Sequence, residues 1–462
     1  MPFTNGPTGQ RQRPPRSRLL RFISVGQVLA RLYIGYRRIG LLQKWRGEAW
    51  AEQRRHEHHR WCAERLYNTA VRNQGLLIKT AQFLSSRPDI VPDEYIDVLA
   101  GLQDEVPPEP MPVVRRLIET ELGQPLETLF REFEEQPVAA ASLAQVHRAV
   151  LHDGRVVAVK VQYSGIERLV TDDLKSNDLF IKILGRLDRT LDFRFISSEM
   201  NKMIPLELDF IHEGRSAEQI AANFAGVEDI VVPEIYWQYT TRRVLVMQFL
   251  DGVKVTDTEG LRRLEVDPAD VAKVIIVAFS EMLLQHGLFH ADPHPGNLLV
   301  APGPKLILVD FGQVKDVGPQ FRFVFSQMTQ ALVADDNTAL GQSFRDLGFR
   351  MQDDSAEGYR ELGRTYVGDI ARQMNETNSG WAKPEMFETS YRDMLRLLRA
   401  NPLIKIPADL LFVGRVMGLL NGLSMTLGSR TNMLVEMARL LEKGNGAIPE
   451  PEKATSRRLL EA

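Results

Sequence analysis

The chain has 462 residues, of which 44% are apolar and 25% charged, and this length predicts roughly two to four domains or one large two-lobed unit. Its single cysteine, Cys62, excludes an internal disulfide framework and a multi-cysteine zinc site. No window of about 20 residues is free of charge, which argues against a transmembrane helix.

The N-terminal region is strongly basic. Residues 1–47 contain ten Arg and Lys and no acidic residue, and subtracting these ten charges from the net charge of −3 leaves about −13 for residues 48–462. Residues 1–17 are rich in Pro, Gly and Arg, which is typical of disorder.

Residues 18–42 have the pattern of a basic amphipathic helix. Its apolar face consists of Phe22, Val25, Leu29, Leu32, Tyr33 and Tyr36. Such a helix lies on an anionic membrane surface, or it packs on the protein's own body with its arginines in solvent, and the sequence leaves both interpretations open. A transit peptide is less favoured because Ser is sparse, so we expect a cytoplasmic location with peripheral membrane association as a hypothesis.

Residues 48–250 change from a helical to a strand-rich pattern. Helical periodicity covers residues 48–135, and SLAQVHRAVL and RVVAVKVQ then flank Asp153-Gly154, which predicts a β-hairpin. A helical stretch at 164–224 precedes RVLVMQFL at 243–250, which we expect to form a buried strand.

The remaining residues are mainly helical around a second hairpin. Asp267 as N-cap and Pro268 in the first turn begin a helix that Gly287 ends. LLV at 298–300 and KLILVD at 305–310 flank a Pro-Gly-Pro turn and predict the hairpin. We expect helices throughout residues 316–444.

The stretch HADPHPGNLLV at 290–300 places Asp292 and Asn297 on a loop that two prolines stiffen. Asp310 ends the next strand and precedes Phe311-Gly312. Phosphoryl transfer needs such a set, because one carboxylate orients or deprotonates the acceptor while an amide oxygen and a second carboxylate bind Mg²⁺. We therefore assign Asp292 to the acceptor, and Asn297 and Asp310 to the metal.

Two other interpretations of this loop are weaker. A zinc site would use His290, His294 and Asp292, but these would be cramped on a short proline-locked loop without further His or Cys nearby in sequence. Simple turn capping by Asp292 and Asn297 leaves Asp310-Phe311-Gly312 unexplained. We expect His290 and His294 to brace the loop.

A phosphoryl-transfer site also needs a lysine that reaches the α- and β-phosphates, and Lys160 at the end of Val157-Ala158-Val159 fits this role. A buried lysine is costly without an anionic partner. We expect Glu207 to be that partner, with Glu199 as the alternative. The preceding turn has alanines where kinases place glycines, and alanine disfavours positive φ.

These motifs together resemble those of the UbiB/AarF-type atypical kinases, a branch of the protein-kinase-like superfamily, and the resemblance extends over residues 65–445. The matching segments are AAAS at 139–142, Glu207-Leu208-Asp209, HADPHPGN at 290–297, DFG at 310–312 and Lys79-Thr80-Ala81-Gln82. The last motif has Ala81 where the family has glycine, which puts the local helix geometry in doubt.

The resemblance implies an α+β, bilobal protein-kinase-like fold with an N-terminal helical extension. The implied segments are a basic arm with an amphipathic helix, a helical extension, an N-lobe, a C-lobe and a polar tail, at 1–47, 48–135, 136–250, 251–445 and 446–462. In this family the extension folds over the nucleotide cleft, so Lys79 and Gln82 are expected at the site of chemistry.

The resemblance further implies ATP and Mg²⁺ as cofactors. Ala139, Ala140, Ala141 and Ser142 would cover the phosphates, and backbone groups of Met247, Gln248 and Leu250 would bind adenine. Lys160 and Glu207 would position ATP.

The expected activity is phosphoryl transfer or ATP hydrolysis that supports ubiquinone or other isoprenoid-lipid metabolism. The expected partners are a small-molecule or lipid-associated substrate, an anionic membrane surface at residues 18–46 and lipid-biosynthesis proteins, without nucleic acid. A conventional protein kinase and a non-catalytic nucleotide-binding scaffold are the alternatives.

Overall fold

The computed structural model describes residues 18–73, 76–85, 92–102, 108–187, 194–376 and 400–443, with a few positions between 381 and 398. The chain divides into two units, which we call unit 1 (Met1–Arg215 and Glu234–Phe249) and unit 2 (Ser216–Pro233 and Leu250–Ala462). The predicted disordered start and polar tail lie outside the described residues, and the predicted domain boundaries stay predictions.

Unit 1 contains a five-stranded antiparallel sheet in the order β1-β3-β4-β6, with β2 pairing β3. The strands are β1 (Glu132–Phe133), β2 (Ala139–Ala140), β3 (Ala144–Val150), β4 (Val156–Gln162) and β6 (Val244–Gln248). The predicted hairpin is confirmed, because β3 and β4 pair directly around Gly154, whose φ of 91° suits glycine. β6 confirms the predicted buried strand.

The two faces of this sheet differ. Side chains alternate along a strand, so Val157, Val159 and Val161 of β4 point to one face and Lys160 to the other. The valines join a buried cluster with α5 (Met111–Leu122) and α6 (Leu126–Leu129). Lys160 is therefore directed away from the main apolar core of the sheet.

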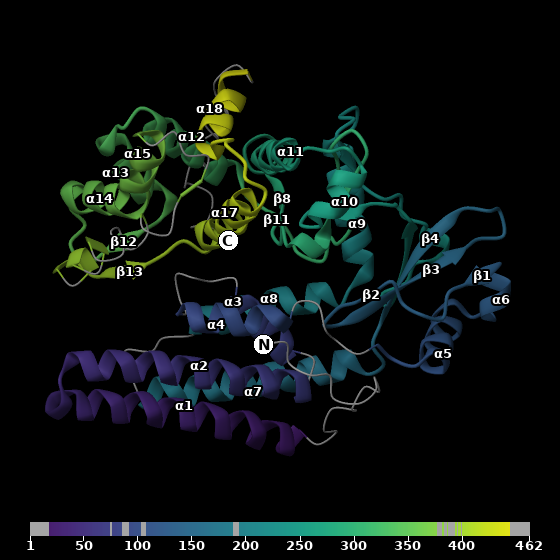
Figure 1. Cartoon of the computed structure of the whole chain (residues 1–462), viewed down its shortest axis with the longest axis horizontal. Coiled ribbons are helices and arrows are strands. Elements are labelled where there is room, and N and C mark those ends of the chain that lie inside the picture. The colour runs from purple at the N-terminus through teal and green to yellow at the C-terminus, as the bar shows by residue number, and fades with distance from the viewer. Residues whose placement is uncertain are drawn as a thin grey trace, which may run out of the picture. The chain divides into compact units, whose positions relative to one another are not determined.

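Helices form the rest of unit 1. They are α1 (Arg18–Arg46), α2 (Glu48–Asn73), α3 (Leu76–Ser85), α4 (Asp93–Leu99), η1 (Ala100–Leu102), α7 (Ile166–Leu187), α8 (Arg194–Glu207), the start of α9 (Phe210–Asn223) and η2 (Trp237–Tyr239). α1 packs along α2 and α7 (Figure 1). A second buried cluster joins α2, α3 and α4, and it includes Cys62, Leu76 and Leu99.

The predicted apolar face of α1 packs on unit 1 itself. Phe22 stacks on Phe180 of α7 with 4.4 Å between ring centroids, and the hydroxyls of Tyr36 and Tyr95 lie 3.0 Å apart. Of the two interpretations left open by the sequence, the structure therefore shows packing of this face on the body. A different set of α1 side chains is exposed, namely Leu19, Leu20, Ile23, Ile34, Leu41 and Trp45.

A buried ion pair fastens α1 to α7. The Nε and Nη2 atoms of Arg21 donate to the two carboxylate oxygens of Asp173 at 3.0 and 2.5 Å, and Nη1 donates to the carbonyl oxygen of Asn73 at the end of α2. Both charged side chains are buried. Burial raises the pKa of Asp173, while the Arg21 guanidinium opposes that rise.

Unit 2 combines small sheets with many helices. One sheet has the order β5-β10-β9-β7 and another pairs β11 with β8. Their strands are β5 (Ile230–Val231), β7 (Val253–Lys254), β8 (Leu288–His290), β9 (Leu298–Ala301), β10 (Lys305–Leu308) and β11 (Val314–Asp316). The predicted hairpin at 298–310 is confirmed by the antiparallel pairing of β9 with β10.

The helices of unit 2 follow the sequence signals closely. They are α10 (Thr258–Arg263), α11 (Pro268–Glu281), η3 (Met282–His286), η4 (Pro295–Asn297), α12 (Pro319–Val333), α13 (Asn337–Leu347), α14 (Ala356–Gly363), η5 (Arg364–Gly368), α15 (Asp369–Glu376), α17 (Ala408–Thr426) and α18 (Met433–Lys443). Asp267 caps α11 by accepting from the N–H of Ala269 at 2.8 Å, and Gly287, with φ 73°, ends the helical run, as predicted.

One expectation for unit 2 was wrong. Residues 316–444 are not helical throughout, because β12 (Arg350–Met351) pairs with β13 (Leu403–Lys405). These two strands are far apart in sequence, so no local pattern indicates their pairing. Among the described residues, no helix is both long and apolar enough to cross a membrane.

The Arg21–Asp173 pair predicts a large loss of stability for Arg21→Met. Removing one partner of a buried pair leaves an uncompensated charge, which costs about 3–5 kcal/mol. The folded-state pKa of Asp173 is already raised, so it binds a proton more readily than the unfolded chain does. The loss should therefore be greatest near neutral pH and should shrink as the pH falls and Asp173 becomes protonated.

Urea unfolding at neutral and mildly acidic pH measures this loss. Arg37→Met, at an exposed position on the same helix, is the control and should change stability by less than about 0.5 kcal/mol. Equal losses in the two variants would contradict the buried pair, and Arg21→Met combined with Asp173→Leu should recover most of the stability.

Candidate functional site

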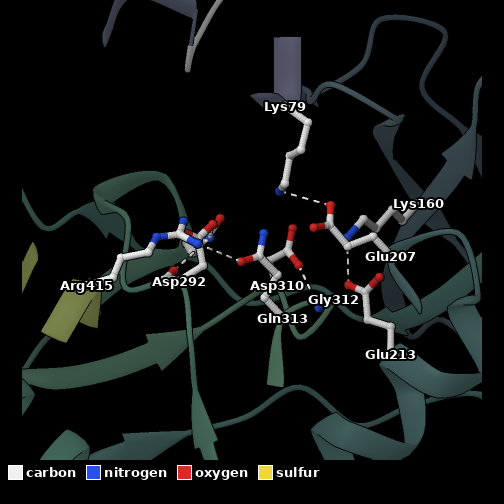
Figure 2. Close-up of polar contacts among 10 residues, drawn as sticks. Lys79, Lys160, Glu207, Glu213, Asp292, Asp310, Gly312, Gln313 and Arg415 are labelled. Atoms are coloured by element: carbon white, nitrogen blue, oxygen red, sulfur yellow. Dashed lines mark hydrogen bonds and ion pairs between the residues drawn. The ribbon is translucent and has the colours of Figure 1, made fainter. Parts of the chain in front are cut away.

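Unit 1 carries one group of candidate functional residues, which centres on a buried lysine. Lys160 of β4 is only 7% exposed, and its Nζ lies 2.6 Å from Oε1 of Glu213, which is 1% exposed (Figure 2). Its ammonium also lies 5.3 Å from the ring centroid of Phe210, a cation–π distance. Lys160 thus has the anionic partner that its burial requires.

The structure shows an ion pair of Lys160 with a glutamate that we did not expect. We expected Glu207, or alternatively Glu199, whereas the recorded ion pair is with Glu213 of α9. The side chain of Glu199 lies outside the described residues. Glu213 becomes the partner because α9 starts just before it and presents its first turn to β4.

A hydrogen-bonded junction holds α8 and α9 against β4. Nε2 of the buried Gln162 donates to the carbonyl oxygens of Leu208 and Arg242 at 2.8 and 3.1 Å. The carboxylate of Asp209 accepts from the N–H groups of Ile211 and His212, at 3.1 and 3.3 Å, and so caps α9. The Glu207-Leu208-Asp209 motif therefore has a structural role, because it sets where α9 begins.

Glu207 pairs with the lysine of the helical extension. Nζ of Lys79 on α3 lies 2.9 Å from Oε2 of Glu207, and both side chains are largely shielded from solvent (Figure 2). The family resemblance implies that these residues share one site, and in the structure they are in contact. Ala81 is buried within α3, which stays helical there. The Gln82 side chain lies outside the described residues.

The alanine-rich segment forms a tight hairpin between β2 and β3. Ala139 pairs with Val146, and the N–H of Ala141 donates to the carbonyl oxygen of Ala144 at 2.8 Å. The connecting Ser142 is buried, as is Leu143, and none of the four residues of AAAS has a positive φ. Ala140 also lies in β2 and pairs with Gln145 of β3. Backbone hydrogen bonds between β2 and β3 therefore define the conformation of this segment.

The backbone at the expected adenine position is already partly hydrogen-bonded. Met247 and Gln248 belong to β6, and the N–H of Gln248 donates to the carbonyl oxygen of Glu234 at 2.8 Å. The next N–H, of Phe249, donates to Val156 at 3.1 Å. The boundary between the two units falls directly after Phe249, so Leu250 belongs to unit 2. Adenine binding here stays a prediction.

Unit 2 carries a second group of candidate functional residues, which is organised around His290, the last residue of β8. Its Nδ1 accepts from the N–H of Asp292 at 3.2 Å, and its Nε2 donates to the carbonyl oxygen of Asp310. The ring is fully buried between the side chains of Phe279 and Phe311. One imidazole therefore positions the backbone of both aspartates.

Two side chains, those of Arg415 and Asn297, donate hydrogen bonds to Asp292. Nη2 of Arg415 on α17 donates to Oδ1 of Asp292 at 2.7 Å, and Nη1 donates to Gln313 at 3.2 Å (Figure 2). Nδ2 of Asn297 donates to the carbonyl oxygen and to Oδ2 of Asp292, at 3.1 and 3.3 Å. These bonds restrict the Asp292 carboxylate to one orientation and offset its charge.

The same bonds decide how Asn297 can act. Because its amide nitrogen is directed to Asp292, its carbonyl oxygen Oδ1 is directed elsewhere. Asp310 begins a tight turn in which its Oδ1 accepts from the N–H of Gly312 at 2.9 Å. An amide oxygen and a carboxylate are hard oxygen ligands of the type that Mg²⁺ prefers.

The two histidines of the loop have bracing roles in this structure. Both ring nitrogens of His290 form hydrogen bonds to backbone groups, and Nδ1 of His294 accepts from the N–H of Gly296 at 3.1 Å. Both ring nitrogens of His290 and Nδ1 of His294 thus bond to backbone groups, which argues against the zinc interpretation.

Sequence reasoning missed Glu213 and Arg415, although both carry a signal. Glu213 interrupts the buried stripe of Phe210, Ala217 and Ile220 on α9, and a charged residue in such a stripe needs a partner. Arg415 interrupts the apolar helix α17 and is only 9% exposed. In both cases the signal indicates burial of a charge but does not identify its partner.

Comparisons with known proteins identify the family of this chain. Residues 101–344 match the family model described as the ABC1 atypical kinase-like domain. AarF domain-containing protein kinase 1 of Xenopus tropicalis is 39% identical over 60% of this chain and 54% of its own length. The Xenopus laevis protein of the same name is 33% identical over 81% of this chain and 72% of its own.

A solved structure supports the fold. The complex of Rv3197 with erythromycin from Mycobacterium tuberculosis has a TM-score of 0.56 and 23% sequence identity, and the match covers 86% of this chain and 98% of that one. With the family model, it confirms the predicted α+β, protein-kinase-like fold. This chain spans only a little more than half of the Xenopus tropicalis relative.

The bonds of His290 predict one tautomer. Burial lowers the pKa of His290, so the ring should be neutral and should carry its proton on Nε2. Nitrogen-15 NMR of histidine-labelled protein measures this directly, with the His290→Gln variant used to assign the signal. A proton on Nδ1, or a protonated ring near neutral pH, would contradict the bracing role.

Proposed function

Because the chain belongs to the ABC1 atypical kinase-like family, we propose that it binds ATP with Mg²⁺ and acts as an ATP-dependent phosphotransferase or ATPase. The observation that carries this proposal is the group formed by Asp292, Asn297 and Arg415. It holds a carboxylate in one orientation and turns an amide oxygen away from that carboxylate, as phosphoryl transfer requires.

The residues of unit 2 fit a magnesium ion. Asn297 through Oδ1 and Asp310 through its carboxylate would hold Mg²⁺, which takes oxygen ligands and keeps several waters. When bound, ATP supplies the phosphoryl group and Mg²⁺ neutralises its charge. The bond from Gly312 and the bond from His290 to the Asp310 carbonyl oxygen keep this residue in place.

Asp292 would orient the acceptor, whether this is water or a hydroxyl group. Both of its carboxylate oxygens accept a hydrogen bond, one from Arg415 and one from Asn297. A fixed carboxylate lowers the entropic cost of aligning the acceptor with the phosphorus atom. Arg415 does not need to touch the acceptor, so we treat it as a positioning residue.

The residues of unit 1 fit the binding of a nucleotide's phosphates. Glu213 holds the ammonium of Lys160 on the polar face of β4, which restricts the directions in which the lysine can reach. A preorganised cation of this kind stabilises phosphate charge without having to be reoriented at each turnover. Lys79 and Glu207 would lie at the same functional centre, as the family resemblance implies.

The class of acceptor follows from the resemblance alone. Similarity to the UbiB/AarF-type kinases supports a small-molecule or lipid-associated acceptor and a role in ubiquinone or other isoprenoid-lipid metabolism. We therefore propose that this chain works beside lipid-biosynthesis proteins. This chain spans about half the length of the Xenopus tropicalis relative. The proposed role therefore concerns the kinase-like part that the two proteins share.

ATP turnover by the full chain tests the proposal. With Mg²⁺, anionic vesicles and quinone-precursor lipids, we expect Asp310→Asn and Asp292→Asn each to lower the turnover rate by at least about 100-fold, a usual loss for a positioned catalytic group. Asp346→Asn is the control, because Asp346 lies on the exposed surface of α13.

The other outcomes of this experiment identify the alternatives. Nucleotide binding with rates that neither substitution changes would indicate a non-catalytic scaffold. Efficient transfer to a generic peptide, with no response to the lipids, would indicate a conventional protein kinase.

We further propose that α1 brings the protein to an anionic membrane surface. The supporting observation is the exposed stripe on this helix, in which Trp45 is 88% exposed and apolar residues alternate with arginines. Indole rings are favourable at the membrane interface, and arginines attract anionic headgroups. The stripe contains Leu20, Ile23, Arg31, Ile34, Arg38, Leu41 and Trp45.

Liposome flotation tests this membrane proposal. Deletion of residues 1–47 would also remove Arg21, so substitutions within the exposed stripe are preferable. We expect Leu41→Glu with Trp45→Glu to abolish most binding to phosphatidylserine vesicles, whereas Val138→Glu, at an exposed position elsewhere in unit 1, should not. Equal flotation of both variants would refute a role for α1.

A further inference from the structure

Three potential metal ligands meet between α2 and α4 of unit 1. His56 and His59 are one helical turn apart on α2 and therefore lie on the same side of it. Glu94 of α4 lies opposite, with its two oxygens 2.5 Å from Nδ1 of His56 and 3.2 Å from Nδ1 of His59. The three ligand atoms all lie within 4.8 Å of one another.

We propose that His56, His59 and Glu94 form a binding site for a divalent metal ion of the zinc class, which joins α2 to α4. Two imidazole nitrogens and one carboxylate oxygen are a donor set that Zn²⁺ uses in proteins. Magnesium is a poor match, because it prefers oxygen ligands. The site thus differs in chemistry from the one at Asn297 and Asp310.

One separation between the ligand atoms already suits a tetrahedral site, and the others would have to adjust. Zinc bonds to nitrogen and oxygen are about 2.0–2.2 Å long, which places neighbouring ligand atoms roughly 3.3 Å apart. The His59–Glu94 separation already has this value, and the His56–Glu94 separation needs to widen. His56 is 66% exposed, so its ring is free to move outward.

The surroundings favour these three residues over their neighbours. His58 lies on the opposite side of α2, where its Nε2 contacts the carbonyl oxygen of Leu32 and the sulfur of Cys62. Cys62 is therefore engaged away from the cluster. The ring of Tyr36 lies 5.6 Å from that of His59 and shields one side of the cluster.

Metal binding would replace the contacts between Glu94 and the two histidines. The Nδ1 atoms of His56 and His59 face the Glu94 oxygens, and they must be unprotonated to bind a metal. With three protein ligands, the exposed side leaves one position for water.

A metal here would crosslink helices that frame the Lys79 motif. α3 carries Lys79 and packs against both α2 and α4. An ion that ties α2 to α4 would therefore stabilise the bundle in which α3 is held, and its occupancy should be visible in the stability of the full chain.

Zinc binding to the full-length protein tests the proposal. After removal of metals with a chelator, Zn²⁺ is titrated in competition with a chromophoric chelator, with excess Mg²⁺ present to occupy sites with oxygen ligands. We expect one zinc per chain in the wild type. His56→Ala, His59→Gln and Glu94→Gln should each weaken binding at least about 10-fold, since even indirect supports of metal ligands have effects of that size.

The control is His152→Gln, which removes an exposed imidazole from the turn between β3 and β4 and should leave zinc affinity unchanged. His56→Ala is the decisive variant if the others fold poorly, because this side chain is exposed. Two further readouts are a visible Co²⁺ absorption spectrum and a zinc-dependent rise in Tm, and His56→Ala should lose both.

Two outcomes would overturn the proposal. Wild-type affinity no greater than that of Glu94→Gln would show that the three side chains form only a hydrogen-bonded cluster. Equal loss of zinc binding in His152→Gln would show that the metal binds to surface histidines in general. Neither outcome would bear on ATP turnover, which depends on residues of other elements.

Discussion

The ion pair between Lys160 and Glu213 is the contact on which the organisation of unit 1 depends. An ammonium buried on the polar face of a sheet would cost several kcal/mol without an anion beside it. The anion can be supplied only if α9 starts at the right place, and Gln162 and the Asp209 cap ensure this. A single buried charge thereby links the sheet, the junction of α8 with α9 and the Lys79–Glu207 pair.

The same constraint recurs in unit 2 with the signs reversed. Asp292 presents an anion in a largely buried loop, and the guanidinium of Arg415 and the amide of Asn297 compensate it. His290 has a different function, because as a neutral ring it links the backbone of one aspartate to that of the other. The residues of greatest chemical interest are thus held by groups that need not touch a substrate.

The N-terminal helices show why an amphipathic pattern is ambiguous. The apolar face of α1 that the sequence displays most clearly packs on α7 and α4, through Phe180 and Tyr95. A second, mixed stripe remains exposed, and only this stripe is free to meet a membrane. Arginines of a basic helix are usually expected in solvent. Arg21 is instead buried, where it pairs with Asp173 and holds α1 to α7.

The local features of this protein follow from its amino-acid sequence. The hairpins around Gly154 and Gly303, the ends of α11 and the alternation along β4 follow from backbone preferences and side-chain periodicity over a few residues. The motifs at Lys79, Lys160, Asp292 and Asp310 were equally visible, because their spacing along the chain is what identifies the family.

Which charged groups meet depends on how distant elements pack in the folded chain. Four contacts join elements that are distant in sequence: Glu213 with Lys160, Arg415 with Asp292, β12 with β13, and Glu94 with two histidines. Periodicity indicates that such a residue is buried. The identity of its partner depends on how helices and strands pack, because packing sets which side chains come within hydrogen-bonding distance.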